Sequence, residues 1–291
     1  YSLYYFLDRQ GYPVTIRSNL KVALIGLYYS CITPFATGGQ PMQVYYYHKD
    51  GVPYGAATSV LSVKFFCYQV ASVGLSLIAL LFAAGYIMET VPGAMIFIVI
   101  GFISNGSSIV GLLLVMLKPN LARRIVAFFV RLLAKLHIVK HPEETLAKLD
   151  GVIEEYFEAI QFAKKKPKKT LMVIVMSGIQ ILCMMVVSYF IYQALGLQGA
   201  PLWLFICLQL LLYTAVSFIP MPGASGAQEV GFYMLFQGIF PQDKLVIVMV
   251  LWRFFTYYLS LCIGGMVTAA DSVMTNVRRM LHKQPPDSDN P

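Results

Sequence analysis

Long apolar runs dominate this chain, and short polar or basic segments separate them. Four runs reach about 18 residues or more, the length typical of a helix that spans a bilayer. They cover residues 57–84, 92–117, 170–195 and 245–270. Because such runs recur along the whole sequence, a signal peptide does not account for them. The pattern predicts an all-α polytopic integral membrane protein.

Two further apolar runs are interrupted near their middles by proline and glycine. The run 19–47 is broken at TPFATGGQP, and the run 201–240 is broken at PMPGASGAQE. Backbone groups that leave a helix inside lipid need partners, so such breaks are tolerated where they are buried in protein or line a cavity. We therefore expect two broken, re-entrant helical hairpins lining a polar cavity. The simpler alternative is a kink, because proline and glycine are frequent in membrane helices.

A basic insert, residues 118–169, separates the two groups of apolar runs and contains twelve Lys or Arg residues. Its first part predicts an amphipathic helix that lies on the membrane surface. Its second part begins near Pro142 and predicts a helix that packs one apolar face on its neighbours. Positive residues gather in cytoplasmic loops, so we expect the insert to be cytoplasmic and to contact anionic lipid rather than nucleic acid.

Composition supports a membrane protein and argues against several kinds of site. Only 12% of the residues are charged and 58% are hydrophobic, whereas soluble domains carry about 25% charged residues. The five cysteines lie in apolar segments without CxxC spacing, which indicates neither disulfides nor metal ligands. The four histidines lie outside the apolar spans. We therefore expect no metal and no cofactor.

The positions of the basic segments predict the topology. With the insert and the basic tail both cytoplasmic, the hairpin 19–47 enters from the cytoplasm and the hairpin 201–240 enters from outside. If a helix whose last turns are YSLYYFLDRQG precedes them, the halves form an inverted repeat with breaks meeting near the midplane. The alternative, a complete crossing by 201–219, would place the tail outside. The single membrane domain 1–291 thus divides into a first half 1–117, the insert 118–169, a second half 170–270 and a polar tail 271–291.

Three ionisable residues, Lys64, Glu229 and Arg253, lie within the predicted membrane depth. Charged residues there are costly and are usually functional. We expect Glu229 to pair with Arg253, because an unpaired buried charge is strongly destabilising. Lys64 and Arg253 each follow one break, and together with helix N-termini they favour an anionic ligand such as a phosphate. Lys64 alone could instead extend its amine to the membrane surface.

Three motifs carry a family resemblance: P-x-x-x-G-G-Q-P at 34–41, P-x-P-G-x-x-G-x-x-E at 220–229 and R-x-x-x-Y at 253–257. They resemble the lysylphosphatidylglycerol synthase/flippase transmembrane domain family, which includes the membrane half of the multiple peptide resistance factor. The likeness covers residues 15–270, and a usual glycine pair reads Gly223-Ala224 here. The expected substrate-binding residues are Gly38, Gly39, Gln40, Lys64, Pro220, Pro222, Gly223, Ser225, Gly226, Glu229, Arg253 and Tyr257.

The resemblance implies a lipid translocase that moves an anionic or aminoacylated phospholipid, such as lysyl-phosphatidylglycerol, between the leaflets of the cell membrane. One alternative is a membrane-embedded transferase acting on lipid-linked substrates, as a phosphatidylglycerol lysyltransferase does, although we expect no soluble transferase domain in this chain. Another is a secondary transporter of a small anion. A lipid substrate predicts a cavity with a side opening, and a soluble anion predicts a closed one. A homo-oligomer is compatible with each function.

Overall fold

The computed structural model describes residue 12 and residues 14–135, 142–164 and 167–281, and these ranges contain helices and no strand. Four helical segments in them are long and apolar enough to cross a membrane: Tyr54–Thr90, Ala94–Leu117, Pro167–Ala194 and Gln242–Met274. They coincide with the four predicted spans, so the predicted all-α membrane fold is confirmed. The expected helix end at residues 1–11 and the tail beyond residue 281 lie outside the described residues.

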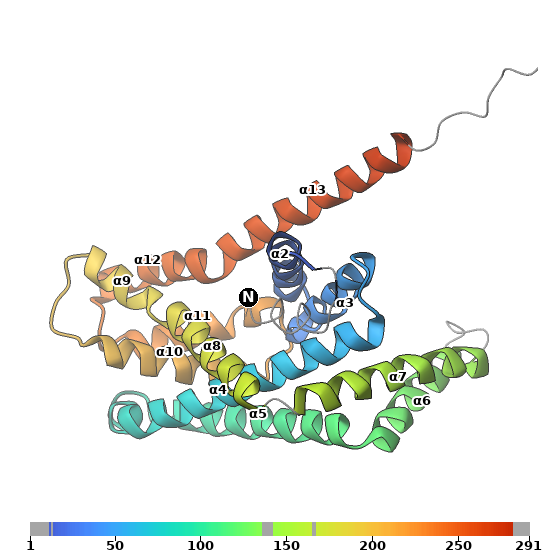
Figure 1. Cartoon of the computed structure of the whole chain (residues 1–291). Helices are drawn as coiled ribbons and strands as arrows, with labels where there is room; N and C mark the ends of the chain where they lie inside the picture. Colours follow the sequence, from blue (N-terminus) through green and yellow to red (C-terminus); the bar gives the residue numbers. More distant parts are fainter. Residues whose placement is uncertain (1–11, 13, 136–141, 165–166, 282–291) are drawn as a thin grey trace, which may run out of the picture.

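The first half of the chain contains a broken helix followed by two long ones (Figure 1). Thr15 caps helix α2 (Ile16–Ile32) by accepting a hydrogen bond from the Ser18 N–H at 3.1 Å. The elements are α2 (Ile16–Ile32), the 3-10 turn η1 (Pro34–Ala36), α3 (Gly39–Lys49), α4 (Tyr54–Thr90) and α5 (Ala94–Leu117).

The two helices of the insert come next, and the second half of the chain follows them. It also contains a broken helix, which lies between two apolar spans. The insert consists of α6 (Pro119–Lys135) and α7 (Pro142–Lys164). A π-helical turn, η3 (Phe254–Tyr258), interrupts the last span. The remaining elements are α8 (Pro167–Met185), α9 (Val187–Ala194), α10 (Leu202–Val216), the 3-10 turn η2 (Pro222–Ala224), α11 (Ala227–Phe236), α12 (Gln242–Arg253) and α13 (Leu259–Leu281).

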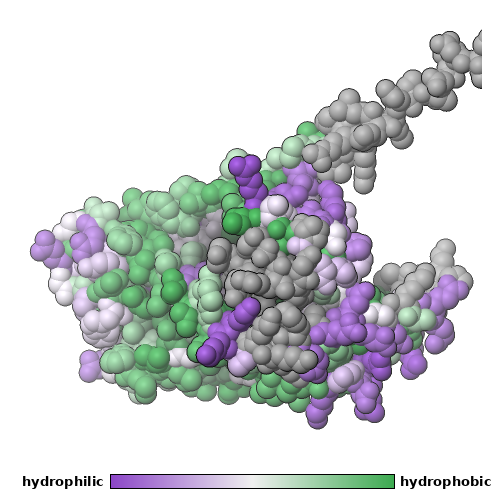
Figure 2. Space-filling model, in the orientation of Figure 1, coloured by the Kyte–Doolittle hydropathy of each residue, from purple (hydrophilic) through white to green (hydrophobic). Residues whose placement is uncertain are grey.

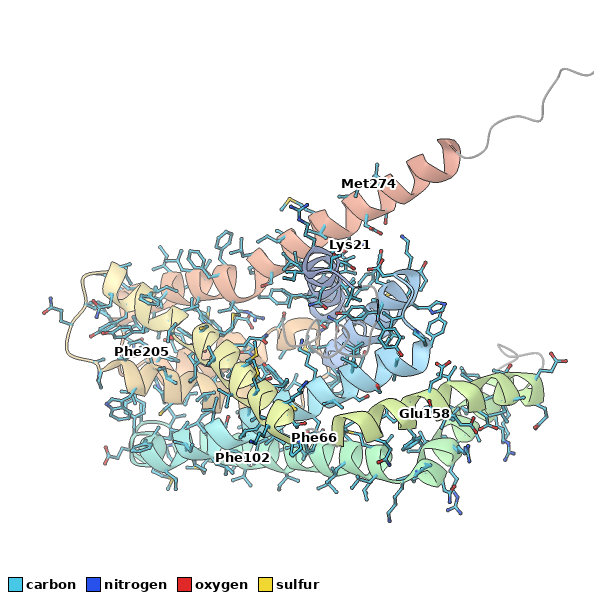
Figure 3. All side chains as sticks on the ribbon, in the orientation of Figure 1. Lys21, Phe66, Phe102, Glu158, Phe205 and Met274 are labelled. Atoms are coloured by element: carbon cyan, nitrogen blue, oxygen red, sulfur yellow. The ribbon has the colours of Figure 1, made fainter. Side chains whose placement is uncertain are left out.

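Aromatic side chains pack α10, α11 and α12 against one another. The Phe232 ring stacks on Phe236, with centroids 4.4 Å apart, and on Trp252, with centroids 4.6 Å apart. Phe205 of α10 is fully buried against Phe236 (Figure 3). This packing fixes Trp252 and therefore positions its neighbour Arg253 at the end of α12.

The insert packs on the first half as its sequence predicts. Helix α7 lies against α4, and Ile153, Tyr156 and Ile160 form its buried face. Arg123 of α6 pairs with Asp150 at 3.5 Å and with Glu154 at 3.4 Å, both on α7. Figure 2 shows hydrophilic residues over α6 and α7 and at the opposite end of the molecule, whereas hydrophobic residues cover most of the part between them.

An ion cluster joins the broken helix of the first half to the last span. Asp271 of α13 is buried and pairs with Lys21 of α2 at 3.0 Å and with Lys49 of α3 at 3.4 Å. Figure 3 shows Lys21 beside α13. The residues on either side of the first break are therefore held to the same helix.

Candidate functional site

The two helix breaks lie side by side, although about 190 residues separate them in the chain. Turn η1 contacts η2, and α2 also contacts η2. The Tyr257 hydroxyl donates a hydrogen bond to the carbonyl of Cys31, at the end of α2, at 2.9 Å. The second half of the chain is thus fastened directly to the first break.

The turns at the two breaks have nearly the same backbone conformation. Phe35 has φ 53° and ψ 18°, and Gly223 has φ 59° and ψ 18°. The residue after each, Ala36 or Ala224, also has positive φ, at 55° and 47°. Non-glycine residues seldom adopt this conformation. A glycine at position 224 would adopt this conformation without strain, so Ala224 carries a local energetic cost.

Hydrogen bonding at the two turns matches as well. The Thr37 hydroxyl donates to the Pro34 carbonyl at 2.9 Å, and the Ser225 hydroxyl donates to the Pro222 carbonyl at 2.9 Å. The sequences 33–40, TPFATGGQ, and 221–228, MPGASGAQ, align without a gap. This residue-level similarity is visible in the sequence, although the predicted repeat rested on the pattern of spans, breaks and cations and not on this alignment.

The breaks diverge at the following glycine, and the divergence creates the charged site. Gly38 has φ −74°, whereas Gly226 has φ 85°. The Gly226 N–H donates to Glu229 Oε2 at 2.6 Å. Glu229 thereby caps the first turn of α11, where a carboxylate also interacts favourably with the helix dipole. At the first break the equivalent position is Pro41, which has no carboxylate.

Arg253 is held from several sides. Its Nε donates to Glu229 Oε1 at 2.5 Å, which confirms the predicted pair. Its Nη2 donates to the Gly223 carbonyl at 3.1 Å and to Ser225 Oγ at 3.3 Å. The guanidinium carbon lies 4.8 Å from the centroid of the Tyr257 ring. The residue is only 6% exposed, and Nη1 donates to no atom of the described residues.

A cavity of about 690 Å³ lies beside the two breaks. Its wall includes Phe35 and Ala36 of η1, Gly223 and Ala224 of η2, and Arg253. The helices α4, α5, α8 and α10 supply much of the rest of the wall, and α2, α11, η3 and the segment 217–221 also contribute. Both breaks therefore line one cavity, with the guanidinium of Arg253 in its wall.

Uncharged polar side chains form much of the cavity wall, and of these only Tyr257 was among the expected binding residues. Asn105 Nδ2 donates to Ser217 Oγ at 2.6 Å, and Gln69 Nε2 donates to Asn105 Oδ1 at 3.1 Å. Glutamine and asparagine residues inside otherwise apolar runs could have indicated this polar wall, because their side chains form hydrogen bonds between membrane helices. We call the amide side chains of the wall the amide cluster: Gln69, Asn105, Gln180, Gln209 and Gln228.

The structure places five of the twelve expected binding residues in the cavity wall or in a hydrogen bond with Arg253. Gly223, Arg253 and Tyr257 line the cavity. Ser225 and Glu229 bond to Arg253, while Pro222 and Gly226 shape the turn that carries them. The other five expected residues neither line the cavity nor belong to the segment 222–229 with its ion pair: Gly38, Gly39, Gln40, Lys64 and Pro220.

Packing explains the glycines among those five. A Cβ atom on Gly39 would lie 2.0 Å from Ser30 Oγ and 2.6 Å from the Gly26 carbonyl oxygen. Gly39 therefore permits close packing of α3 on α2. The N–H of Gly38 donates to Thr33 Oγ1 at 2.8 Å. Lys64 lies on α4, half-buried, without an ion pair in the described part of the chain.

Comparison with known proteins identifies the family of the chain. A sequence profile of a family described as "Lysylphosphatidylglycerol synthase TM region" matches residues 2–264. Searches of curated proteins and of solved structures gave no match. Because the profile covers nearly the whole chain, including both breaks and Arg253, the chain belongs to the lysylphosphatidylglycerol synthase TM region family.

Proposed function

We propose that this protein is a lipid translocase, which moves an anionic or aminoacylated phospholipid such as lysyl-phosphatidylglycerol, or another phosphate-bearing lipid, between leaflets. The observation that carries the proposal is Arg253, a cation in the cavity wall with Nη1 free of partners among the described residues. A charged headgroup crosses hydrocarbon only at high cost. A polar cavity with a fixed cation lowers that barrier.

The contacts of Arg253 suit it to bind a phosphate reversibly. Glu229 and the turn at Gly223 fix the plane of the guanidinium, so little side-chain freedom remains to be lost on binding. A guanidinium offers several N–H donors in a plane, which matches phosphate oxygens. Because Glu229 neutralises Arg253, the attraction for phosphate is moderate, which favours release on the other side.

The cavity suits a lipid better than a soluble anion. Apolar side chains that are exposed, namely Phe35, Met184 and Met221, line it together with the polar groups. Acyl chains need such a lateral apolar border while the headgroup occupies the polar part. A closed cavity for a small ion would not need exposed apolar lining residues. This observation favours the translocase over a secondary transporter of a small anion.

The site is less suited to transferase chemistry. Acyl or glycosyl transfer needs a base positioned beside a nucleophile. Neither a carboxylate nor an imidazole is among the described residues that line the cavity. Glu229 lies nearby, but its two oxygens accept hydrogen bonds from Arg253 and from the Gly226 N–H.

The proposal includes the topology expected from the basic segments. Both broken helices are re-entrant, the halves form an inverted repeat, and the breaks lie near the midplane. The insert and the C-terminus are cytoplasmic, and the protein is a multi-pass protein of the cell membrane. The matching turns at 34–37 and 222–225 support the repeat, because two unrelated kinks would not share backbone angles and hydrogen bonds.

Reconstitution into liposomes tests the proposal. Translocation of fluorescent phosphatidylglycerol is measured from the fraction of label protected from an impermeant quencher. We expect transport by the wild type, slower transport by Arg253→Lys and no transport by Arg253→Met. Arg123→Met, an exposed position of the insert, serves as the matched control and should transport normally. Equal transport by Arg253→Met and the wild type would contradict the proposed role of Arg253.

A further inference from the structure

The buried apolar side chains of the described residues form two separate clusters, which we call the first core and the second core. The first core joins α2 and α3 to α7 and to the first part of α4, and the second core joins α9, α10, α11 and α12 to the second part of α4. Because close-packed side chains deform little, a change in the shape of the protein falls at the boundary between two cores. Examples are Val22, Ile25, Tyr47, Ala57 and Ile160 in the first core and Phe205, Leu208, Phe236, Val248 and Trp252 in the second.

The last span contacts a different partner on each side of the π turn η3. Before η3, α12 contributes Val248 and Trp252 to the second core. After η3, α13 packs closely on α2, because a Cβ atom on Gly264 would lie 2.7 Å from the Leu24 carbonyl oxygen. The ion pair of Asp271 with α2 fastens these two helices a second time. The span therefore passes at η3 from the second core to a helix of the first.

The turn η3 has the backbone and the surroundings of a joint. Its last hydrogen bond runs from the Leu259 N–H to the Phe254 carbonyl, five residues back, whereas an α-helix bonds four residues back. Such turns are rare and are frequently found at functional sites. None of the five residues of η3 is buried, and Phe254, Phe255 and Tyr258 are each about half exposed. The turn can therefore change its conformation without disturbing either core.

Tyr257, within η3, contacts both helix breaks. A Cβ atom on Gly223 would overlap the Tyr257 ring, so the ring lies directly against the second break. The Tyr257 hydroxyl donates to the Cys31 carbonyl, beside the first break, at 2.9 Å. Arg253, just before η3, is tied to the second break through Glu229. A bend at η3 would thus separate Tyr257 from Cys31 and leave the Glu229–Arg253 pair intact.

We propose that η3 is a hinge in the last span, and that the hydrogen bond from Tyr257 to the Cys31 carbonyl is the latch that holds this hinge in its observed conformation. The inference rests on the proposed function, because a cavity that carries a lipid between leaflets has to open to each side in turn. Release of the latch lets α13 and α2 swing together, so that the first break moves away from the second. Glu229 and Arg253 stay with α11 and α12.

The opposite side of the molecule confines this movement to the wall formed by the last span. Figure 1 shows α4 and α5 along one side and α12 and α13 along the other, with α13 leaving η3 at an angle to α12. Helix α4 runs through both cores without interruption. It therefore holds the two cores together, and a bend at η3 widens the cavity on the side of the last span.

Distances between spin labels, measured by double electron–electron resonance on the full chain in nanodiscs, test the hinge without relying on transport. The native cysteines are removed first. One label replaces Ile96 of α5, a helix that contributes to the second core, and the other replaces Val246 of α12 or Val273 of α13. All three side chains are more than half exposed, so labels fit there without repacking. We expect a single distance between positions 96 and 246, and a major and a minor distance between positions 96 and 273.

Variants of η3 separate the latch from the hinge. Tyr257→Phe removes the latch but keeps the ring, and the loss of one hydrogen bond should raise the ratio of the minor to the major distance about fivefold. Tyr258→Phe is the matched control in the same turn, and it should leave this ratio unchanged because its hydroxyl has no part in the latch. Deletion of Phe255 removes the extra residue of the π turn and should leave one distance between positions 96 and 273.

A single, unchanged distance between positions 96 and 273 in both the wild type and Tyr257→Phe would overturn the hinge. A minor distance that persists after deletion of Phe255 would overturn it as well. If the deletion variant does not fold, the response to Tyr257→Phe decides alone. A hinge that responds as expected, in a protein that translocates no lipid in liposomes, would uphold the hinge and refute the translocase. Translocation by a protein with one fixed distance would do the reverse.

Discussion

At the scale of single residues, Glu229 has two roles that depend on each other. Through Oε2 it caps α11, and through Oε1 it holds Arg253. The cap requires the N–H of Gly226 to point at the carboxylate, and the positive φ of that glycine allows this. The position of the cavity cation is thus fixed by the local geometry of the second break.

We predict that Glu229→Gln destabilises the protein, because it leaves the buried guanidinium without a counter-charge. Breaking a fully buried pair costs about 3–5 kcal/mol, and the loss here should be smaller, since the Glu229 side chain is 26% exposed. The double variant Glu229→Gln, Arg253→Met should regain stability without regaining transport. Thermal unfolding in detergent measures the first effect and the liposome assay the second. A double variant as unstable as Glu229→Gln would refute the explanation.

At the scale of helices, the two broken segments are similar turns placed in different surroundings. The first break is filled by close packing of α3 on α2, whereas the second carries the Glu229–Arg253 pair. Sequence reasoning expected Gly39 and Gly226 to serve the same purpose, namely approach of the backbone to a ligand. The structure separates them: Gly39 is needed for packing and Gly226 for backbone conformation.

We predict that Gly39→Ala lowers the melting temperature. The added methyl group would meet the Gly26 carbonyl and Ser30, so α3 would have to move away from α2. Gly74→Ala is the matched control, because a Cβ atom at Gly74, inside α4, meets nothing within 4 Å. Differential scanning fluorimetry compares the two. Equal melting temperatures for Gly39→Ala and the wild type would show that the α2–α3 packing is looser than described.

The membrane-spanning helices could be predicted from the sequence, because the length of an apolar run indicates a helix that crosses the bilayer. The four spans, both breaks and the buried face of α7 follow from such patterns. Pairing of Glu229 with Arg253 was also predictable from the cost of buried charge. The amide cluster was not predicted, since glutamine carries no charge, and only the fold shows which amides share a cavity. Lys64 looked like a second site cation, but it is not among the residues that line the cavity.

At the scale of the whole molecule, the proposed inverted repeat makes a test of topology possible. Single cysteines are introduced at Gly199, Asp243 and Glu143 in a background without the native cysteines. An impermeant maleimide added to intact cells should label the first two, which lie in the α9–α10 connection and at the start of α12, and should spare Glu143 in the insert. Labelling of positions 143 and 243 from the same side would refute the paired re-entrant hairpins.

The most direct test of the account is an experimental structure of the protein in lipid nanodiscs that contain phosphatidylglycerol. The account predicts density for a phospholipid whose phosphate lies within about 3 Å of Arg253 Nη1. The acyl chains should leave past Phe35 and Met221, the exposed apolar residues of the cavity wall. A cavity filled only by water, or a lipid whose phosphate avoids Arg253, would contradict the central claim.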